Sequence, residues 1–435
     1  MSRAMKDSHI DWIGAIPEDW STIPFRRVFE ITKRLAGRTG LDVLSVTQQG
    51  IKIKDLSSNE GQMAQDYSNY QLVFPTDFVM NHMDLLTGYV DISSYTGVTS
   101  PDYRVFRARK PQEISLEYFL HIFQLCYKCK IFYHLGQGVS GFGRWRLPAK
   151  QMLLFELPLP PLNEQQTIAD FLNKKCGEID EMVSLQEKIV EELKAYKQSV
   201  ITEAVCKGLN PDIPMKDSGI EWIGQIPSHC RIAKIGSIIT GYKAGPFGSA
   251  LITGNLLTQG DILVYTPEHI TKRETSIEGN LYLPPERLVE MSQFVVKQGE
   301  IIFPIVGSLG RAMQITKEMP LGIINQRLSK FSLIDEEVDN DYFMWVFGKS
   351  AFYSTFIDLH SRGAIIVNLT KQIVCNMPIV LHPLAEQRAI SAFLNERCSE
   401  IDTLISVRQA KIEALKEYKK SIIYEYITGK KEING

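Results

Sequence analysis

Two stretches of the chain carry hydrophobic residues at every third or fourth position. The first set is Leu172, Cys176, Ile179, Val183, Val190, Leu193, Val200 and Ala204, and the second is Leu394, Cys398, Ile401, Ile405, Ile412, Leu415, Ile422 and Tyr426. This spacing places apolar side chains along one side of an α-helix. We therefore predict helices over about 163–208 and 385–429, each roughly 65 Å long.

An apolar seam on such a long helix requires a partner along its length. We expect the two helices to pack on each other in antiparallel orientation, as a two-helix coiled coil. The alternative is that each helix is buried separately in a domain of its own.

The ends of both predicted helices carry recognisable signals. Asn163 is a good N-cap, and Gln166 three residues later completes a capping-box pattern. The second copy has Ala385 at the position of Asn163, so we expect a weaker cap there. Gly208 and Gly429 follow the last periodic residues and are expected to end the helices.

The segments outside these helices show short alternating runs separated by turn residues, which is typical of strands. Strands are predicted at 72–74, 78–79, 89–92, 103–107, 301–306 and 321–324. Helices are predicted at 116–135 and 342–356. The pattern indicates a mixed α/β (α+β) fold.

The chain is also an internal repeat. Residues 7–17 (DSHIDWIGAIP) resemble residues 217–227 (DSGIEWIGQIP), and residues 161–180 resemble residues 383–402. A repeat this long is a duplicated domain with its connector. We expect domains at 1–160 and 211–381, and helical connectors at 161–210 and 382–435. The unlike segments inside the two similar frames suggest a protein that reads two different things at a fixed spacing.

Bulk composition restricts the class of protein without identifying it. The 435 residues are 44% hydrophobic and 23% charged, as in ordinary globular chains. No apolar run of membrane-spanning length and no signal-peptide core is visible, so a cytoplasmic location is expected. The seven cysteines are scattered and odd in number, which predicts free thiols. Cys126 and Cys129 form a single CxxC without a second ligand pair, so we expect buried apolar positions there and no metal site.

Charge is unevenly distributed although the net charge is only −2. Between residues 104 and 150, nine basic residues stand against Glu113 and Glu117, with aromatic residues between them. The basic residues are Arg104, Arg107, Arg109, Lys110, Lys128, Lys130, Arg144, Arg146 and Lys150. Such a stretch can follow a phosphate backbone, although a solvated surface is the plainer interpretation.

Sequence motifs for catalysis are missing. The chain has no (D/N/S)PP(Y/F/W) tetrapeptide, no glycine-rich cofactor loop after a strand, no G-x-x-x-x-G-K-(S/T) phosphate loop and no HExxH pair. We therefore expect a non-catalytic chain with no catalytic residues, no bound metal and no cofactor.

The repeated (D/E)WIGxIP entry and the repeated PLxEQ-plus-long-helix exit resemble the specificity subunit of type I restriction–modification systems. The resemblance covers essentially the whole chain. It implies two target-recognition domains in a pseudo-two-fold arrangement, at about 18–157 and 228–380, separated by antiparallel spacer helices. Each domain would read one half of a bipartite, asymmetric site in double-stranded DNA.

The resemblance also implies partners. The helices would set the half-site spacing and dock two copies of a DNA adenine-N6 methyltransferase subunit, with restriction/translocase subunits joining for cleavage in host defence. S-adenosylmethionine, ATP and Mg would then belong to the partner subunits. The residues expected on the helices are Pro161, Leu162, Glu164, Gln165, Leu172, Ile179 and Leu193, with Pro383, Leu384, Glu386, Gln387, Leu394, Ile401 and Leu415 in the second copy.

Candidate DNA-contacting residues follow from the preference of Arg and Lys for guanine and phosphate, and of Asn and Gln for adenine. In the first insert they are Arg104, Gln137, Ser140, Phe142, Arg144, Trp145 and Arg146. In the second they are Lys243, Lys272, Arg273, Ser308, Arg311, Asn325, Gln326, Arg327, Arg362, Asn368 and Lys371. The segment 307–311 (GSLGR) has its nearest counterpart at 86–89 in the first insert.

Two alternatives stay open at this point. One is the specificity subunit of a related type IIB/IIG-like methyltransferase–nuclease, which also reads bipartite sites. The other is a duplicated coiled-coil scaffold that binds proteins but not DNA.

Overall fold

The structure is a computed structural model of the full chain. It describes residues 3–433 except 56–66, 139–144, 248–250, 252, 308, 351–352, 354, 358 and 360–368. The chain forms two compact units, Met1–Glu187 with Gln409–Gly435 and Lys188–Arg408. Each long helix is therefore divided between the units, and each unit is described by itself below.

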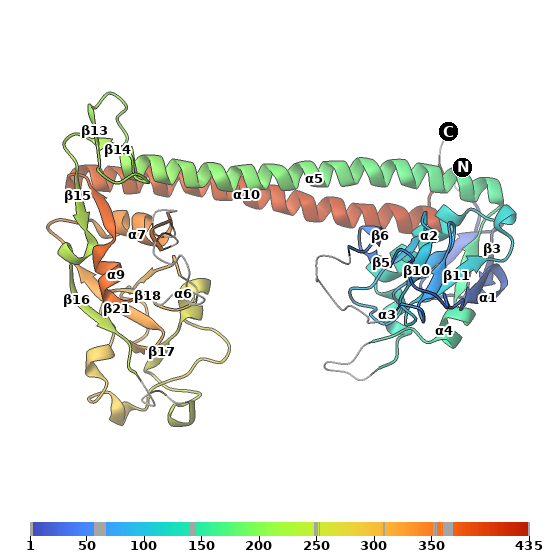
Figure 1. Ribbon diagram of the computed structural model, residues 1–435, viewed down its shortest axis with the longest axis horizontal. Coiled ribbons are helices and arrows are strands. Elements are labelled where there is room, and N and C mark those ends of the chain that lie inside the picture. Colours follow the sequence, from blue (N-terminus) through green and yellow to red (C-terminus); the bar gives the residue numbers. More distant parts are fainter. Residues whose placement is uncertain are drawn as a thin grey trace. The chain divides into compact units, whose positions relative to one another are not determined.

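Unit 1 is built on a four-stranded antiparallel sheet in the order β4-β11-β8-β9. These strands are Phe29–Thr32, Arg104–Ala108, Phe78–Met80 and Val90–Ile92. Helix α2 (Leu116–Lys128) covers one face of the sheet (Figure 1). Phe119 and Phe123 of this helix contact Phe29 of the sheet, with ring centroids 5.3 and 5.4 Å apart, so aromatic packing forms the core.

The remaining elements of unit 1 are short. The strands are β1 (Met5–Asp7), β2 (Ala15–Pro17), β3 (Ser21–Pro24), β5 (Leu44–Thr47), β6 (Gly50–Ile53), β7 (Gln71–Val73), β10 (Gly97–Thr99) and β12 (Glu156–Leu159). The helices are α1 (Phe25–Val28), α3 (Ile131–His134) and α4 (Ala149–Leu154).

Unit 2 repeats this plan with a four-stranded antiparallel sheet in the order β16-β21-β18-β19. These strands are Ile239–Ala244, Leu328–Leu333, Ile301–Pro304 and Met313–Gln314. Helix α7 (Asn340–Gly348) contributes Phe343 and Phe347 to the core, where they pack against Phe303 and Phe331. The other strands are β13 (Met215–Asp217), β14 (Gln225–Pro227), β15 (Arg231–Lys234), β17 (Leu263–Tyr265), β20 (Gly322–Ile324) and β22 (Pro378–Leu381), and the short helices are α6 (Pro267–Lys272) and α9 (Lys371–Asn376).

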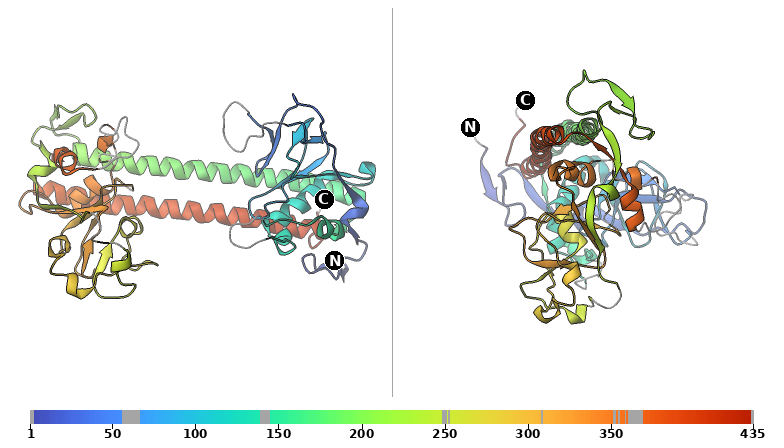
Figure 2. Two further views of the ribbon diagram at one scale, coloured as in Figure 1. Left: turned by 60° about the horizontal axis from the view of Figure 1, so that its bottom comes forward. Right: turned by 90° about the vertical axis from the view of Figure 1, so that its left-hand side faces the viewer.

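The two long helices are α5 (Leu162–Lys207) and α10 (Leu384–Ile427). Within each unit their segments lie side by side and antiparallel (Figures 1 and 2). In unit 1, Lys419 forms an ion pair with Asp180; in unit 2, Lys197 forms the matching pair with Asp402. The predicted seam residues are all buried or half-buried. The antiparallel packing predicted from the hydrophobic pattern is therefore confirmed.

The C-terminal ends of the two long helices agree with the sequence-based prediction, whereas their N-terminal caps do not. Gly208 and Gly429 have positive φ values of 74° and 68° just after the helices, as expected of glycine caps. The predicted N-cap at Asn163 is wrong, because the helix already begins at Leu162 and the carbonyl of Pro161 accepts the first helical hydrogen bonds. Pro383 plays the same role in α10, so the expected difference between the two caps disappears.

The repeated (D/E)WIGxIP motif forms the turn and the second strand of a β-hairpin in each unit, β1–β2 in unit 1 and β13–β14 in unit 2. Its isoleucines are buried, among them Ile13 and Ile16 in unit 1. Gly14 and Gly224 have φ values of 68° and 72°, which is why the motif requires glycine there. Lys430, just after α10, donates to the carbonyl of Ile13. The motif is a structural joint and not a binding loop.

Three local expectations are corrected by the structure. The helix predicted at 116–135 is interrupted at Lys130, which has a φ of 57° and separates α2 from α3. The helix predicted from residue 342 begins earlier, and its described part is α7 followed by helical residues near Tyr353. Cys126 is buried as expected, but Cys129 is exposed because it follows the end of α2. Among the described residues, no helix combines the length and hydrophobicity of a membrane span.

Candidate nucleic-acid interface

One end of the main sheet of unit 2 gathers several of the predicted DNA-contacting residues. Strands β16 and β18 end there and β21 begins there, because Ala244 pairs with Ser329 and Pro304 with Leu328. This register brings Lys243 together with the loop 325–327. Residues far apart in the sequence therefore share one edge of the sheet.

The loop at this edge is held by close backbone contacts. Asn325 accepts a hydrogen bond from the backbone N–H of Arg327 through its side chain, at 3.0 Å. A Cβ added to Gly245 would lie 1.9 Å from the carbonyl oxygen of Asn325, so only glycine fits there. Gln326 and Arg327 are exposed. The loop presents an amide and a guanidinium on a rigid turn.

Two lysines lie over aromatic rings in the same region. The Nζ atom of Lys243 is 5.4 Å from the ring centroid of Phe294, and that of Lys371 is 5.7 Å from the ring of Tyr242. Such packing restricts a lysine side chain while keeping its charge available.

A second basic group lies in a hollow of about 500 Å³ in unit 2. Arg273, Arg311 and Lys349 line it, and Arg311 donates to the carbonyl of Thr271 at 3.1 Å. Burial lowers the pKa of Lys349, and the charge of Arg273 lowers it further. Lys349 was not predicted, since a single lysine after an aromatic helix carries no signal. Lys272 does not line this hollow. It forms an exposed ion pair with Glu268.

The corresponding sheet end of unit 1 is formed by the loop 81–89 and by the base of the segment 137–146. Gln137 and Arg146 face each other as an isolated β-bridge with two backbone hydrogen bonds, and both are exposed. Trp145 donates from its indole nitrogen to the carbonyl of Tyr133 at 2.7 Å. The structure therefore brings Gln137 and Arg146 together and fixes the neighbouring indole.

Arg104 lies beneath this segment and not on the surface. It is 7% exposed, and its guanidinium donates to the carbonyl of Leu147 at 3.1 Å. Burial, followed by the charges of Arg104 and Arg146, lowers the pKa of His82 to about 4. This geometry gives Arg104 a supporting position under the loop.

The loop 81–89 lies between β8 and β9, and residues 305–312 lie between β18 and β19. Because the two sheets have the same strand order, these loops occupy equivalent places. The weak likeness of residues 86–89 to residues 307–311 therefore reflects a real topological match. Ser140, Phe142, Arg144, Ser308, Arg362 and Asn368 lie outside the described residues.

The basic stretch from 104 to 150 does not form one continuous surface. Arg107 and Arg109 both pair with Glu30, at 2.6 and 3.4 Å, and Lys110 pairs with Glu113 at 2.8 Å. With Arg104 buried, the local charge excess is distributed over several sides of unit 1.

The predicted helix residues divide into buried and accessible groups. Gln165, Leu172, Ile179, Gln387, Leu394 and Ile401 are buried, Leu162, Glu164, Leu193, Leu384, Glu386 and Leu415 are half-buried, and Pro161 and Pro383 are exposed. Gln165 accepts from the backbone N–H of Ser115 at 2.9 Å and donates to the carbonyl of Pro160 at 2.8 Å. Gln387 makes the equivalent bonds to Asp339 and His382. These glutamines join each recognition fold to its helix.

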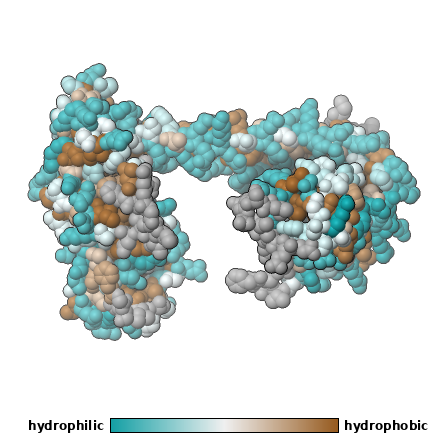
Figure 3. Space-filling view, in the orientation of Figure 1, coloured by the Kyte–Doolittle hydropathy of each residue, from teal (hydrophilic) through white to brown (hydrophobic). Residues whose placement is uncertain are grey.

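Other apolar residues of the helices are exposed, and they are matched by the repeat. Unit 1 exposes Met182, Leu185 and Tyr418, and unit 2 exposes Leu404, Val407 and Tyr196 at positions exactly one repeat of 222 residues away. In Figure 3 the visible surface of the helices is mostly hydrophilic, with hydrophobic residues scattered along it. Repeated exposure at the same positions is more informative than any single exposed side chain.

Residues 17–200 match the family model of the type I restriction modification DNA specificity domain. The chain is therefore similar, over this part, to type I restriction–modification specificity subunits. A Methanocaldococcus jannaschii protein provisionally named as the MjaX type I restriction enzyme specificity subunit is 23% identical over 433 residues, which cover 96% of this chain and 95% of the relative. The MjaVIII type I restriction enzyme specificity subunit of the same organism is 24% identical over 300 residues, covering 68% of this chain and 67% of the relative.

Solved structures from type I restriction–modification systems share the fold. A chain from a structural study of complex assembly and conformational transition of the type I R-M system matches with a TM-score of 0.70 and 14% identity, covering 95% of this chain and 98% of that one. The HsdS subunit from Thermoanaerobacter tengcongensis matches with a TM-score of 0.50 and 15% identity over the same shares. Both likenesses extend over both units and both long helices of this chain.

Proposed function

We propose that this chain is a type I restriction–modification specificity subunit and that each of its units reads one half of a bipartite, asymmetric target in double-stranded DNA. One observation carries the proposal: the same sheet-and-helix frame is built twice, and at the equivalent sheet end it presents polar residues on loops that come from different parts of the two repeats, after α3 in unit 1 and before β21 in unit 2. Gln137 and Arg146 stand at that end in unit 1, and Gln326 and Arg327 in unit 2. Reading two unlike half-sites requires a constant frame and different loops at the sheet end of each unit.

The chemistry of these residues suits the major groove. An arginine can donate two hydrogen bonds to guanine, and a glutamine can pair with adenine through its amide. The basic hollow lined by Arg273, Arg311 and Lys349 suits a phosphate, because contacts to the backbone position a protein without specifying sequence. We assign base reading to the exposed loop residues and phosphate binding to the hollow.

The long helices are proposed to set the half-site spacing and to dock two copies of a DNA adenine methyltransferase subunit. The repeat of exposed apolar residues supports two equivalent docking positions. Each unit would offer one partner copy an exposed triad at equivalent positions, Met182, Leu185 and Tyr418 in unit 1 and Leu404, Val407 and Tyr196 in unit 2. Restriction/translocase subunits would join through the methyltransferase, and those partners would carry S-adenosylmethionine, ATP and Mg. The purified chain alone is expected to show neither methyl transfer nor DNA cleavage.

DNA reading is tested with the variants R146A and R327A in the assembled methyltransferase complex. If each arginine reads a base, its loss should cost about 1–3 kcal/mol of binding and relax one half of the recognised sequence only. If it contacts phosphate, binding should weaken equally for all sequences, with a flatter salt dependence. Selection of bound sequences from a random DNA pool distinguishes these results.

Arg27→Ala is the matched control for these variants. Arg27 is exposed in α1, which precedes β4 and therefore lies at the opposite end of the sheet from Arg146. The proposal fails if R146A and R327A bind and select DNA as R27A does. A chain that binds no DNA in the complex would favour the scaffold alternative.

Docking is tested with L185E and V407E, singly and together. Each charge lies on the exposed triad of one unit, so each single variant should retain one methyltransferase copy and the double variant none. S184E and S406E are the controls, because they place the same charge about 100° around the helix at exposed serines. Native mass spectrometry counts the copies, and a double variant with two copies would refute this docking surface.

A further inference from the structure

Four side chains that can bind metal meet within unit 2, where β15 and β22 adjoin the start of α10. Cys230 immediately precedes β15, and His382 immediately follows β22. Since Arg231 pairs with Leu381 in these antiparallel strands, Cys230 and His382 are cross-strand neighbours. Glu386 lies four residues beyond His382 in the first turn of α10, and His229 adjoins Cys230. The topology alone therefore assembles the group.

The donor atoms are close to one another. The Sγ of Cys230 is 3.2 Å from Nδ1 of His382, and that nitrogen is 3.4 Å from a carboxylate oxygen of Glu386. The Nε2 of His229 is 2.9 Å from the other carboxylate oxygen. Ligands of a tetrahedral zinc ion are roughly 3.3–3.6 Å apart, given ordinary zinc–nitrogen, zinc–oxygen and zinc–sulfur distances. Among the described residues, the ligand atoms of His229, Cys230 and Glu386 lie within 4.8 Å of one another, and Nδ1 of His382 adjoins the Cys230 and Glu386 atoms of this group.

The imidazole of His382 is oriented as a metal ligand would be. Its Nε2 lies 2.9 Å from the carbonyl oxygen of Val205, which can only accept, so Nε2 carries the proton and donates. Nδ1 is then left with its lone pair pointing at Cys230 and Glu386. Zinc-binding histidines commonly use their second nitrogen in this way, which fixes the ring and its tautomer.

Two residues of the group are buried, and the other two are partly exposed to solvent. Cys230 and His382 are 1% and 3% exposed, whereas the side chains of His229 and Glu386 are about one-third exposed. A cation held by Cys230 and His382 would therefore be shielded from solvent on its inner side. The two outer residues leave a route from solvent for that cation.

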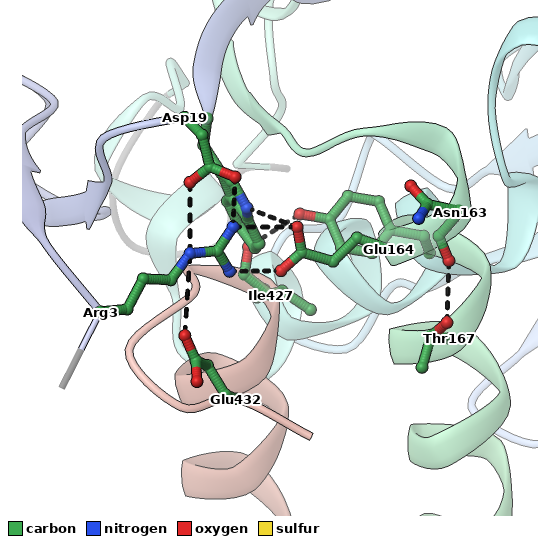
Figure 4. Close-up of polar contacts among 9 residues, drawn as sticks. Arg3, Asp19, Asn163, Glu164, Thr167, Ile427 and Glu432 are labelled. Atoms are coloured by element: carbon green, nitrogen blue, oxygen red, sulfur yellow. Dashed lines mark hydrogen bonds and ion pairs between the residues drawn. The ribbon is translucent and has the colours of Figure 1, made fainter. Parts of the chain in front are cut away.

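Unit 1 shows what stands at the equivalent joint. Glu164, the counterpart of Glu386, accepts from the guanidinium of Arg3 and from the indole of Trp20, and Arg3 also donates to Asp19 (Figure 4). Arg3 thus supplies positive charge to a carboxylate at the start of α5. The entry motifs 7–17 and 217–227 are 210 residues apart, and at this offset Arg3 corresponds to Ile213, while Asp19 and Trp20 are replaced by His229 and Cys230. The arginine of one joint is replaced in the other by neutral donors with metal-binding chemistry.

From this geometry we infer that His229, Cys230, His382 and Glu386 form a zinc site in unit 2. The mixed nitrogen, sulfur and oxygen donors suit Zn²⁺ better than Mg²⁺ or Ca²⁺, which prefer oxygen ligands alone. The ion would cross-link β15, β22 and the first turn of α10, as the Arg3 ion pairs do at the first joint. This inference departs from the sequence-based expectation of a chain without metal, and it does not depend on DNA reading.

The test uses the full-length chain, purified without a polyhistidine tag. Elemental analysis should find about one zinc per chain, and cobalt added to the chelator-treated protein should give a thiolate charge-transfer band and tetrahedral visible bands. C230S and H382N should each weaken zinc binding at least about 100-fold, since ligand loss exceeds the 10–100-fold effect of outer partners. C129S is the matched control, because Cys129 is an exposed free cysteine far from the group in sequence, and it should bind zinc as the parent does.

Stability gives a second measurement. A chelator should lower the unfolding temperature of the parent chain and of C129S but should not lower that of C230S. Should C230S or H382N fail to fold, H229N changes an outer, solvent-accessible ligand and should still weaken binding. The inference is overturned if the folded parent binds neither zinc stoichiometrically nor cobalt with a thiolate band. It is equally overturned if C230S, H382N and H229N bind zinc as tightly as C129S.

Discussion

Replacing Gln165 with alanine should destabilise unit 1 strongly although no charge and little apolar surface is lost. The side chain is 1% exposed and makes two hydrogen bonds, one from the backbone N–H of Ser115 and one to the carbonyl of Pro160. Both backbone groups would lose their partner in the variant. An unsatisfied buried polar group costs about 1–3 kcal/mol, so we expect a loss of about 2–5 kcal/mol after some relaxation.

Urea unfolding followed by far-ultraviolet circular dichroism measures this loss. Hydrogen exchange of the peptide containing Ser115 adds a local reading, because the N–H that donates to Gln165 should exchange faster in the variant. Gln166→Ala is the matched control, since Gln166 is the next residue of the same helix and is exposed. If Q165A unfolds at the same urea concentration as Q166A, with unchanged exchange at Ser115, the glutamine is not the link between recognition fold and helix.

Three further predictions concern the core, pH and spacing. Leu394→Ala removes a fully buried seam residue and should cost about 2–5 kcal/mol in urea unfolding, whereas exposed Leu404→Ala should cost far less; equal losses would contradict the seam. Burial lowers the pKa of His121 to about 4, below its ordinary value of 6.5, so the unfolded chain binds a proton that the folded chain does not. Stability of unit 1 is therefore full above pH 6.5 and falls as the pH drops towards 4, and H121Q should flatten this dependence in unfolding measured at several pH values. Removing one heptad from both α5 and α10 should change the preferred spacer between half-sites but neither half-site sequence, as selection of bound sequences would show. Altered half-site sequences would refute the proposal that the domains read the sequence while the helices set the spacing.

The hydrophobic period predicted the long helices because burial along one helix face leaves a direct record in the sequence. Strands at 78–79 and 89–92 were predicted for the same reason, and the structure places β8 at Phe78–Met80 and β9 at Val90–Ile92. Gly208 was predicted to end its helix because a positive φ restricts residue choice. Asn163 was misjudged as a cap, since the carbonyl that starts the helix belongs to Pro161 and carries no side-chain signal.

The candidate sites were harder to predict, because they depend on how distant segments pair. Arginine is usually a surface residue, so nothing in the sequence indicated that Arg104 is buried. Only the fold shows that its guanidinium lies beneath the segment 137–146. Lys349 joins Arg273 and Arg311 from a different part of the chain. Cys230 and His382 are 152 residues apart and meet only through the register of β15 with β22.

The matched contacts explain how the same sheet-and-helix frame can carry unlike loops in the two units. In both units a buried glutamine of the long helix accepts from the residue before the domain helix, and in both an asparagine of the long helix meets that helix again. Asn173 contacts His121 in unit 1, and Asn395 accepts from Trp345 in unit 2, so the asparagine is kept while its partner changes. These contacts lie where each recognition fold meets its helix, and the residues proposed to read DNA lie in loops at an end of each main sheet. Loops at those sheet ends can therefore vary without disturbing the joint, which is the physical condition for altering what is read while keeping the spacing at which it is read.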